Sequence, residues 1–290
     1  MPRSAPIRVT GAGSAKEAAG GWRAQLALEF ERRAARTVLA ARRHDGPLVI
    51  QKPLYPEGDG VCHGIIVHPP GGIAGGDDIQ LSARLDVNAH ALLTTPGAGK
   101  WYRSVGAEAR QCLQFDVSGG ACLEWLPQEN IIFTGALAEL RTVVRLSGDG
   151  SYIGWEICCL GRSGSGETFS NGSFSARTLI ERDQRPLWLE NGTFTGGGVA
   201  LQSAVVLAGQ SVVGTLIAAS HKLDSAVLEV CRQVRPITGD GAVTLLPGLF
   251  VGRYLGGSSE AAKNYFIKLW HNLRPVVAGR EAIDPRIWRT

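Results

Sequence analysis

The sequence predicts a mainly β protein, a scaffold built as a meander of β-sheet with two α-helices toward its C-terminus. Apolar and polar residues alternate along several short segments, turn signals separate these segments, and helical periodicity is confined to the C-terminal part. Glycine accounts for 38 of the 290 residues, or about 13% against an ordinary share of roughly 7%. So much glycine without a collagen-like period is typical of tight turns between short strands.

The clearest strand signal lies at residues 79–87, IQLSARLDV. Every second residue is apolar, which is the two-residue period of a half-buried strand. We therefore expect one buried face made of Ile79, Leu81, Ala83, Leu85 and Val87. The same period recurs at Leu113, Phe115 and Val117.

Three turn signals follow predicted strands. They are Gly119-Gly120, Gly148-Asp149-Gly150 and Asn191-Gly192. Dipeptides of this kind join the two strands of a hairpin, and strands joined so closely pair antiparallel. We therefore expect neighbouring segments to form an antiparallel meander.

Two segments have helical periodicity. In 222–234 the apolar residues Leu223, Val227, Val230 and Val234 recur at spacings of three and four, which gives one apolar face. In 258–273 a serine, Ser258 or Ser259, can cap a helix with an apolar stripe. Arg274-Pro275 is expected to end this second helix.

Residues 1–21 are expected to form a flexible tail, and residues 22–290 a single β-rich domain. The first residues contain no apolar run suited to a signal peptide. Six cysteines without a signal peptide favour reduced thiols and a cytoplasmic protein. No two of them form a Cys-x-x-Cys pair. The net charge of +4 is scattered rather than striped, and no segment suits a membrane span. Nucleic-acid and membrane partners are therefore not expected.

Two segments resemble catalytic motifs but lack residues that those motifs require. A phosphate-binding P-loop ending at Gly99-Lys100 would need glycine at 94 and a hydroxyl residue at 101, where the chain has Thr94 and Trp101. The segment GRSGSGE at 161–167 lacks the glycine spacing of a serine nucleophile elbow. Neither segment therefore predicts a catalytic residue.

A metal site is harder to dismiss. Cys62, His63 and His68 lie close together, with Asp77 and Asp78 after them. Thiolate and imidazole suit zinc or nickel, and carboxylates can complete the shell, but the spacing matches no standard site. One functional alternative is therefore a β-rich metal-dependent hydrolase that uses the Cys62–Asp78 region. The glycine-rich stretch 68–78 inside it reads either as a turn or as a rigid loop presented to a partner.

Several longer motifs carry a family resemblance. They are YPEG at 55–58, HPPGGIAGGD at 68–77, TTPGAGKWYRS at 94–104, EWLPQENIIF at 124–133, GWEICCLGR at 154–162, the Leu-Trp and Leu-Arg-Pro pairings of 269–275 and PRIW at 285–288. From Trp22 onward the chain resembles the family of the urease accessory protein UreD, called UreH in some bacteria.

The resemblance implies a β-rich superhelical fold with a helical pair and a role that is not enzymatic. Family members are described as scaffolds or metallochaperones that bind apo-urease together with UreF and the GTPase UreG. Nickel then enters urease at the expense of GTP, and a passage for nickel through the family's proteins has been proposed. No tightly bound cofactor is implied, although nickel(II) can bind transiently.

A protein that hands nickel on should hold it briefly, with carboxylates, imidazoles and water rather than a thiolate cage. We therefore place four carboxylates nearer the nickel route than Cys62 or His63. They are Asp77, Glu129, Glu156 and Glu167. Each of the glutamates could equally be a structural acceptor for turn amides.

Partner binding is expected to depend on aromatic and arginine anchors. The second helix and the segment after it supply Tyr265, Trp270, Arg274, Arg286 and Trp288. The apolar stripe of the helix can instead pack on the β body, so the final segment is the better interface candidate.

Overall fold

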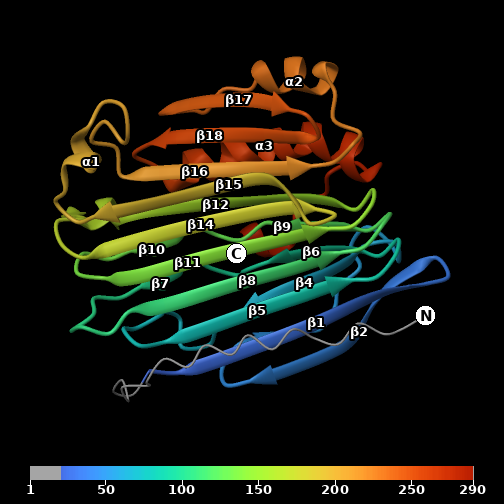
Figure 1. Ribbon diagram of the computed structural model, residues 1–290, viewed down its shortest axis with the longest axis horizontal. Helices are drawn as coiled ribbons and strands as arrows, with labels where there is room; N and C mark the ends of the chain where they lie inside the picture. Colours follow the sequence, from blue (N-terminus) through green and yellow to red (C-terminus); the bar gives the residue numbers. More distant parts are fainter. Residues whose placement is uncertain (1–20, 290) are drawn as a thin grey trace.

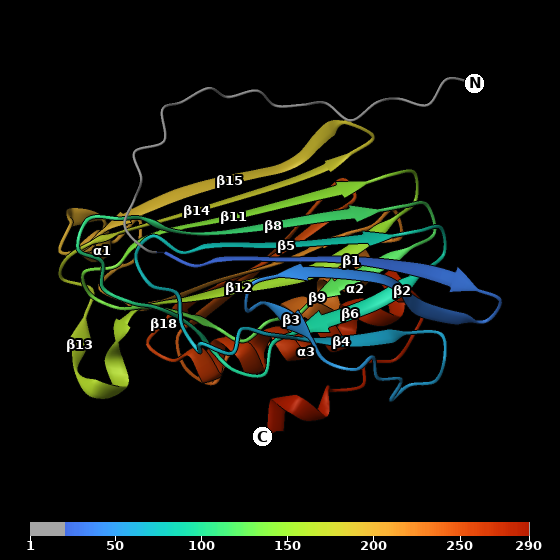
Figure 2. The ribbon, with the colours of Figure 1, turned by 90° about the horizontal axis from the view of Figure 1, so that it is seen from below.

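The computed structural model describes residues 21–289 and consists of two large β-sheets packed face to face (Figures 1 and 2). The predicted tail lies outside the described residues except for Gly21. The seven-stranded first sheet has the order β15 (Arg185–Thr195), β14 (Ser173–Arg182), β11 (Leu137–Leu146), β8 (Ala109–Val117), β5 (Asp78–Leu85), β1 (Arg23–Arg33), β2 (Arg36–Asp45).

The second sheet has eleven strands. Its main path is β17 (Asp240–Leu246), β18 (Leu249–Gly256), β16 (Val212–Ala219), β12 (Ser151–Arg162), β9 (Cys122–Trp125), β6 (His90–Thr94), β4 (Cys62–Val67), β3 (Val49–Ile50). Three short strands lie off this path: β7 (Gly99–Trp101), β10 (Asn130–Ile132) and β13 (Glu167–Thr168).

The chain winds between the sheets as a β-solenoid. It passes from β5 in the first sheet to β6 in the second, back to β8, and on through β9, β11, β12 and β14. Successive strands within each sheet are therefore parallel, with Leu81 beside Leu113 and His90 beside Cys122. The other pairs in the part of the chain described are antiparallel: β1–β2 and β14–β15 in the first sheet, and β3–β4, β12–β13, β12–β16, β16–β18 and β17–β18 in the second. The mainly β class and its superhelical arrangement are confirmed.

The antiparallel meander was wrong at all three turn signals. The turns at Gly120 and Gly148, both with positive φ, carry the chain from one sheet to the other. A turn signal specifies that the chain reverses, but stacking two amphipathic strands buries their apolar faces directly, whereas pairing them side by side does not. Asn191-Gly192 lies inside β15, and the hairpin turn is Asp183-Gln184, with φ of 50° and 65°.

The core between the sheets follows the predicted alternation. In β5 the residues Ile79, Leu81, Ala83 and Leu85 face the interior, while Gln80 and Arg84 face solvent. Val87 is the exception, because β5 ends at Leu85 and the side chain of Val87 is 60% exposed in the turn that follows.

Helices α2 (Ser225–Arg232) and α3 (Ser259–Ala278) cover the outer face of the second sheet over strands β12, β16, β17 and β18. The buried face of α2 and the last residue of α3 differ from those predicted. Helix α2 is capped by Asp224 and buries Val227, Leu228 and Cys231. Val230, placed on the apolar face by the sequence, is 52% exposed because the contact face is set by a neighbouring helix and strand. The remaining helical elements are short: α1 (Val199–Gln202), η1 (Ser163–Ser165) and η2 (Arg286–Arg289).

Helix α3 (Ser259–Ala278) starts as predicted, with Ser258 accepting a hydrogen bond from the amide of Ala261. The predicted stop at Arg274-Pro275 was wrong, since Pro275 lies inside the helix and the chain leaves it at Gly279, with φ of 65°. Proline costs a helix about 3 kcal/mol, but the side chains on either side of it, Arg274 and Val277, are buried. The buried contacts of these residues therefore offset the cost of Pro275, and the helix continues past it.

A buried polar cluster fixes α3 to the second sheet. The carboxylate of Glu124 on β9 accepts hydrogen bonds from Trp270 Nε1 (2.6 Å), from Arg274 Nε (3.0 Å) and from the ring of His90 (2.7 Å). Arg274 also reaches Glu57 in the loop before β4, at 2.7 Å. These residues form what we call the arginine cluster: Glu57, His63, His90, Glu124, Trp270 and Arg274.

Both carboxylates of this cluster are held ionised. Burial alone would raise the pKa of Glu57, but the hydrogen bonds from His63 and Arg274 hold it at about 2. For Glu124 burial likewise opposes ionisation, yet His90 and Arg274 hold its pKa below the ordinary value. The guanidinium therefore compensates two buried negative charges at once, and α3 is the element that supplies it.

We predict that Arg274→Ala destabilises the protein by about 3–5 kcal/mol, because breaking a buried ion pair leaves its carboxylates uncompensated. Urea unfolding followed by circular dichroism measures the loss. Arg42→Ala is the matched control, since Arg42 is exposed on β2 and surface substitutions change stability by about 0.5 kcal/mol or less. Equal stability of the two variants would contradict this role of the cluster.

Candidate functional site

Two cavities lie between the sheets, each lined mainly by apolar side chains with a few polar groups among them. The first, here called the loop cavity, has a volume of about 180 Å³ and lies between the loop at 68–73 and the turn at 95–99. The second, the strand cavity, has a volume of about 110 Å³ and lies among β11, β12, β14, β15 and β16. Trp125 and Glu156 line both cavities, so these two side chains stand between them.

Glu156 is the titratable group that the two cavities share. It belongs to β12, whose flanking residues Trp155 and Ile157 are buried on the opposite face of the sheet. Burial raises the pKa of Glu156 to about 7, because little water is left to solvate its charge. Asn130 Nδ2 donates to its carboxylate at 3.3 Å. Near neutral pH this carboxyl group is therefore poised between its two protonation states.

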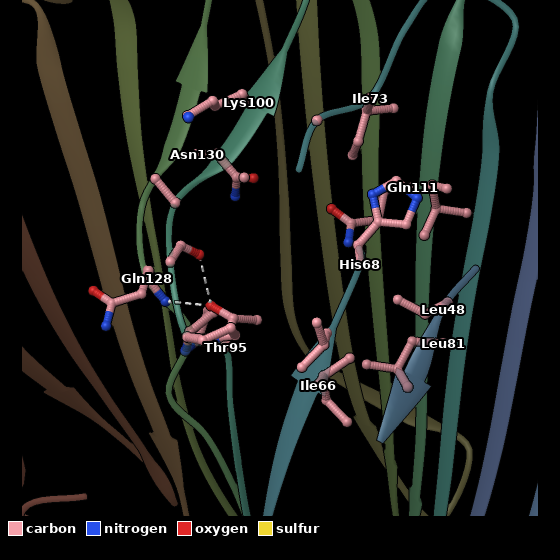
Figure 3. Close-up of a pocket in the computed structure, with 18 of the residues that line it drawn as sticks. Leu48, Ile66, His68, Ile73, Leu81, Thr95, Lys100, Gln111, Gln128 and Asn130 are labelled. Carbon is pink, nitrogen blue, oxygen red and sulfur yellow. Dashed lines mark hydrogen bonds between the residues drawn. The ribbon is translucent and has the colours of Figure 1, made fainter. Parts of the chain in front are cut away.

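The loop cavity adds neutral ligand atoms. Figure 3 shows His68 and Gln111 on one side of the cavity, with Thr95, Gln128 and Asn130 on the other. Burial lowers the pKa of His68, and its Nε2 atom has no hydrogen-bond partner among the described residues. A neutral imidazole, amide oxygens and one carboxyl group can bind a divalent cation weakly. They do not form a closed cage.

The other predicted carboxylates are placed differently. Asp77 is buried and accepts hydrogen bonds from the amides of Trp22 and Ala74, both at 2.8 Å. Glu129 lies at the start of α3, where Ser259 Oγ is 3.4 Å from its carboxylate. Glu167 pairs with Arg162 at 2.7 Å and accepts from the amide of Thr134 at 3.1 Å. None of these three lines the two cavities.

The Cys62–Asp78 region does not converge on one point. Cys62 is buried, His63 pairs with Glu57 at 2.5 Å in the arginine cluster, and His68 faces the loop cavity. Among residues 21–289 no group of three or more His, Cys, Asp or Glu side chains is arranged to hold a metal ion. Within the same residues no helix is long and apolar enough to cross a membrane.

The expected partner anchors divide into two groups. Tyr265, Trp270 and Arg274 are fully buried against the second sheet. The apolar face of α3 therefore packs on the β body, which was the alternative to partner binding. Trp288 is partly buried, with its ring 5.7 Å from those of Trp155 and Trp270 and its Nε1 donating to Thr94 at 2.9 Å. Arg286 remains exposed.

The sequence did not reveal which residues surround Glu124, Arg274 and Glu156 in the folded protein. Glu57 lies in the YPEG motif, and Gln128 and Asn130 lie in EWLPQENIIF, but neither motif indicates which residues these side chains contact. His90 and Gln111 belong to none of the motifs. A weak signal was available in the acidic residues flanked by tryptophan and proline, at 124–129. This signal does not predict that Glu124 faces α3 or that Asn130 faces Glu156.

The fold and the cavities define the class of protein, a two-layered β-solenoid with cavities between its sheets. A sequence profile described as "UreD urease accessory protein" matches residues 23–289, and the chain belongs to this family. The UreD protein of Azoarcus sp. (strain BH72) is 57% identical over 270 residues, which cover 93% of this chain and 95% of the relative. The UreD protein of Dechloromonas aromatica is 51% identical over 281 residues, or 96% and 98% of the two chains.

Family membership confirms the resemblance found in the sequence. UreD proteins are non-catalytic accessory factors of urease maturation. The alternative of a metal-dependent hydrolase in the Cys62–Asp78 region is therefore set aside.

The raised pKa of Glu156 makes a prediction about stability and pH. Below an ordinary glutamate pKa of 4.5 the group is protonated in both the folded and unfolded chain, so it costs nothing. As pH rises toward 7, only the folded state retains the proton, and stability falls by up to about 3 kcal/mol. Glu156→Gln should remove this loss.

Urea unfolding at pH 5 and pH 8 measures the difference between the variant and the wild type. Glu139→Gln is the control, because Glu139 is on the outer face of the first sheet beside Arg110, with 42% of its side chain exposed. We expect the Glu156 variant to gain stability over the wild type at pH 8 relative to pH 5. The same pH dependence in both variants would overturn the assignment.

Proposed function

We propose that this chain assists the GTP-dependent insertion of nickel into apo-urease, in a complex with UreF and the GTPase UreG, without any turnover of its own. Family membership supports the urease role, and the cavities between the sheets support a part in moving the ion. The six cysteines are free thiols, which supports action in the cytoplasm. No cofactor needs to be tightly bound for this role.

The observation that carries the proposal is the position of Glu156 between the loop and strand cavities. A carboxyl group that titrates near neutral pH can accept a cation as it loses its proton and release the cation as the proton returns. His68 supplies a neutral imidazole in the loop cavity. We therefore place Glu156 and His68 on the nickel route.

We propose smaller roles on the nickel route for the other three carboxylates, Glu129, Asp77 and Glu167. Glu129 lies beside Gln128, which lines the loop cavity, and can act near its edge. Asp77 and Glu167 are engaged by backbone amides and by Arg162, so an ion would have to displace existing hydrogen bonds. The route therefore depends mainly on Glu156.

Reconstitution tests the route. Purified UreF, UreG, apo-urease and this chain are combined with nickel, bicarbonate and GTP, and the nickel content and urea hydrolysis of the urease are measured. We expect the double variant Glu156→Gln, His68→Ala to lower the nickel loading about tenfold, the scale on which metal-site support residues act. Glu139→Gln should behave as the wild type.

Assembly of the complex is checked in parallel by gel filtration, since a variant that fails to join the complex says nothing about the route. Undiminished nickel loading in a complex that contains the double variant would refute the route. Loading that is independent of the whole chain would refute the proposed function.

We also propose that the segment after α3 contacts UreF. The ring of Trp288 and the ion pair between Asp284 and His271, at 2.7 Å, hold this segment on α3. That attachment leaves the guanidinium groups of Arg286 and Arg289 exposed, beside a groove that Leu54 and Ile65 also line. Exposed arginines next to apolar surface are common anchors of protein interfaces.

The charge reversal Arg286→Glu, Arg289→Glu is expected to reduce the capture of UreF in a pull-down by about tenfold or more, as hot-spot arginines do. The control pair Arg42→Glu, Arg43→Glu changes the charge equally on β2, where both side chains are exposed. Equal capture by the two double variants would contradict the assignment of this segment.

A further inference from the structure

A third cavity lies at the opposite end of the solenoid from the loop cavity. Strands β6, β9 and β12 begin beside it, at His90, Cys122 and Ser151, whereas β6 ends next to the loop cavity at Thr94. We call it the turn cavity, because the stacked turns at Asn88, Gly120 and Asp149 form one of its walls. Its volume is about 240 Å³, and nothing in the proposed nickel route uses it.

Three cationic side chains line the turn cavity: Arg32 from the end of β1, Lys222 from the turn after β16, and Arg280 from just beyond α3. They come from parts of the chain that are far apart in sequence. Within residues 21–289 none of the three forms an ion pair, whereas six arginines on the first sheet do. Their convergence is therefore a product of the tertiary fold.

Among the described residues, the hydrogen bonds that these cations make go to backbone carbonyl oxygens and not to carboxylates. Arg32 donates to the carbonyl oxygens of Ala34 (3.0 Å) and Gly60 (3.2 Å). Lys222 Nζ is 3.4 Å from the carbonyl oxygen of Val277, near the end of α3, where a positive charge is favourable. Arg280 has no hydrogen bond among the described residues, and its guanidinium lies against Gly60, where a Cβ atom would collide with it.

One acidic side chain, Asp149, lines the same cavity. Its carboxylate already accepts a hydrogen bond from the amide of Gly120, at 2.6 Å. The three cations and the one carboxylate together contribute a net charge of about +2 around the cavity. Charges of one sign around one cavity repel each other, and a bound counter-ion reduces that repulsion.

We infer that the turn cavity binds a small oxyanion of the size and charge of phosphate, held by the guanidinium groups of Arg32 and Arg280 and the ammonium group of Lys222. Guanidinium groups present paired N–H donors that match two oxygens of such an anion. Asn88 also lines the cavity, and its side-chain amide can donate a further hydrogen bond. A doubly charged anion would neutralise the site.

Isothermal titration of the full-length chain with inorganic phosphate tests this inference, in a buffer whose ionic strength is kept constant with sodium chloride. We expect one binding site in the wild type and an affinity at least about tenfold lower in Arg280→Ala, because a hydrogen bond to a charged group contributes about 1.5–3 kcal/mol. Arg280→Lys keeps the charge but loses the paired donors and should be intermediate.

Arg42→Ala is the matched control, since it removes the same charge from an exposed position on β2 outside the cavity. We expect it to bind phosphate as the wild type does. Equal affinities in Arg280→Ala and Arg42→Ala, or no heat of binding for the wild type at millimolar phosphate, would overturn the inference. Thermal unfolding with and without phosphate gives a second readout, because a ligand that binds only the folded state raises its melting temperature.

Discussion

The structure depends on one buried guanidinium. Arg274 brings the only positive side chain of the arginine cluster that is charged at every ordinary pH, and it faces Glu124 and Glu57. Buried carboxylates of this kind are costly unless they are paired and hydrogen-bonded. Through Trp270 and Arg274, helix α3 is bonded to Glu124 on β9 and to Glu57 in the loop before β4. These polar bonds add to the packing of the helix on β12, β16 and β18.

The same winding that creates the core also creates the cavities. Each coil of the solenoid passes from one sheet to the other, so the turns at one end stack on one another and the longer loops gather at the other end (Figure 2). Polar groups on neighbouring coils are thereby brought into layers. Asn130 reaches Glu156 because β10 pairs with β12, although the two residues are 26 positions apart. The site is a property of the stacking rather than of any single motif.

Local patterns predicted the elements better than their pairing. The alternation in 79–87 placed four of its five apolar residues in the core, and Ser258 capped the long helix as expected. The hairpin predictions were wrong because a two-residue turn can join two strands paired in one sheet or two strands stacked in different sheets. The helix stop at Pro275 failed because the buried side chains around it outweigh a local penalty. In each case a long-range contact decided between locally acceptable alternatives.

By itself the sequence determined the mainly β class, the strands at 79–85 and 113–117, both late helices, and the family, since all of these follow from short-range periodicity and from motifs read in order. Only the tertiary structure decided that the strands run parallel in two stacked sheets, that Trp270 and Arg274 face inward, and that Glu156 lies between two cavities. The physical reason is that burial and charge compensation depend on which segments meet. A residue's neighbours along the chain do not specify its neighbours in space.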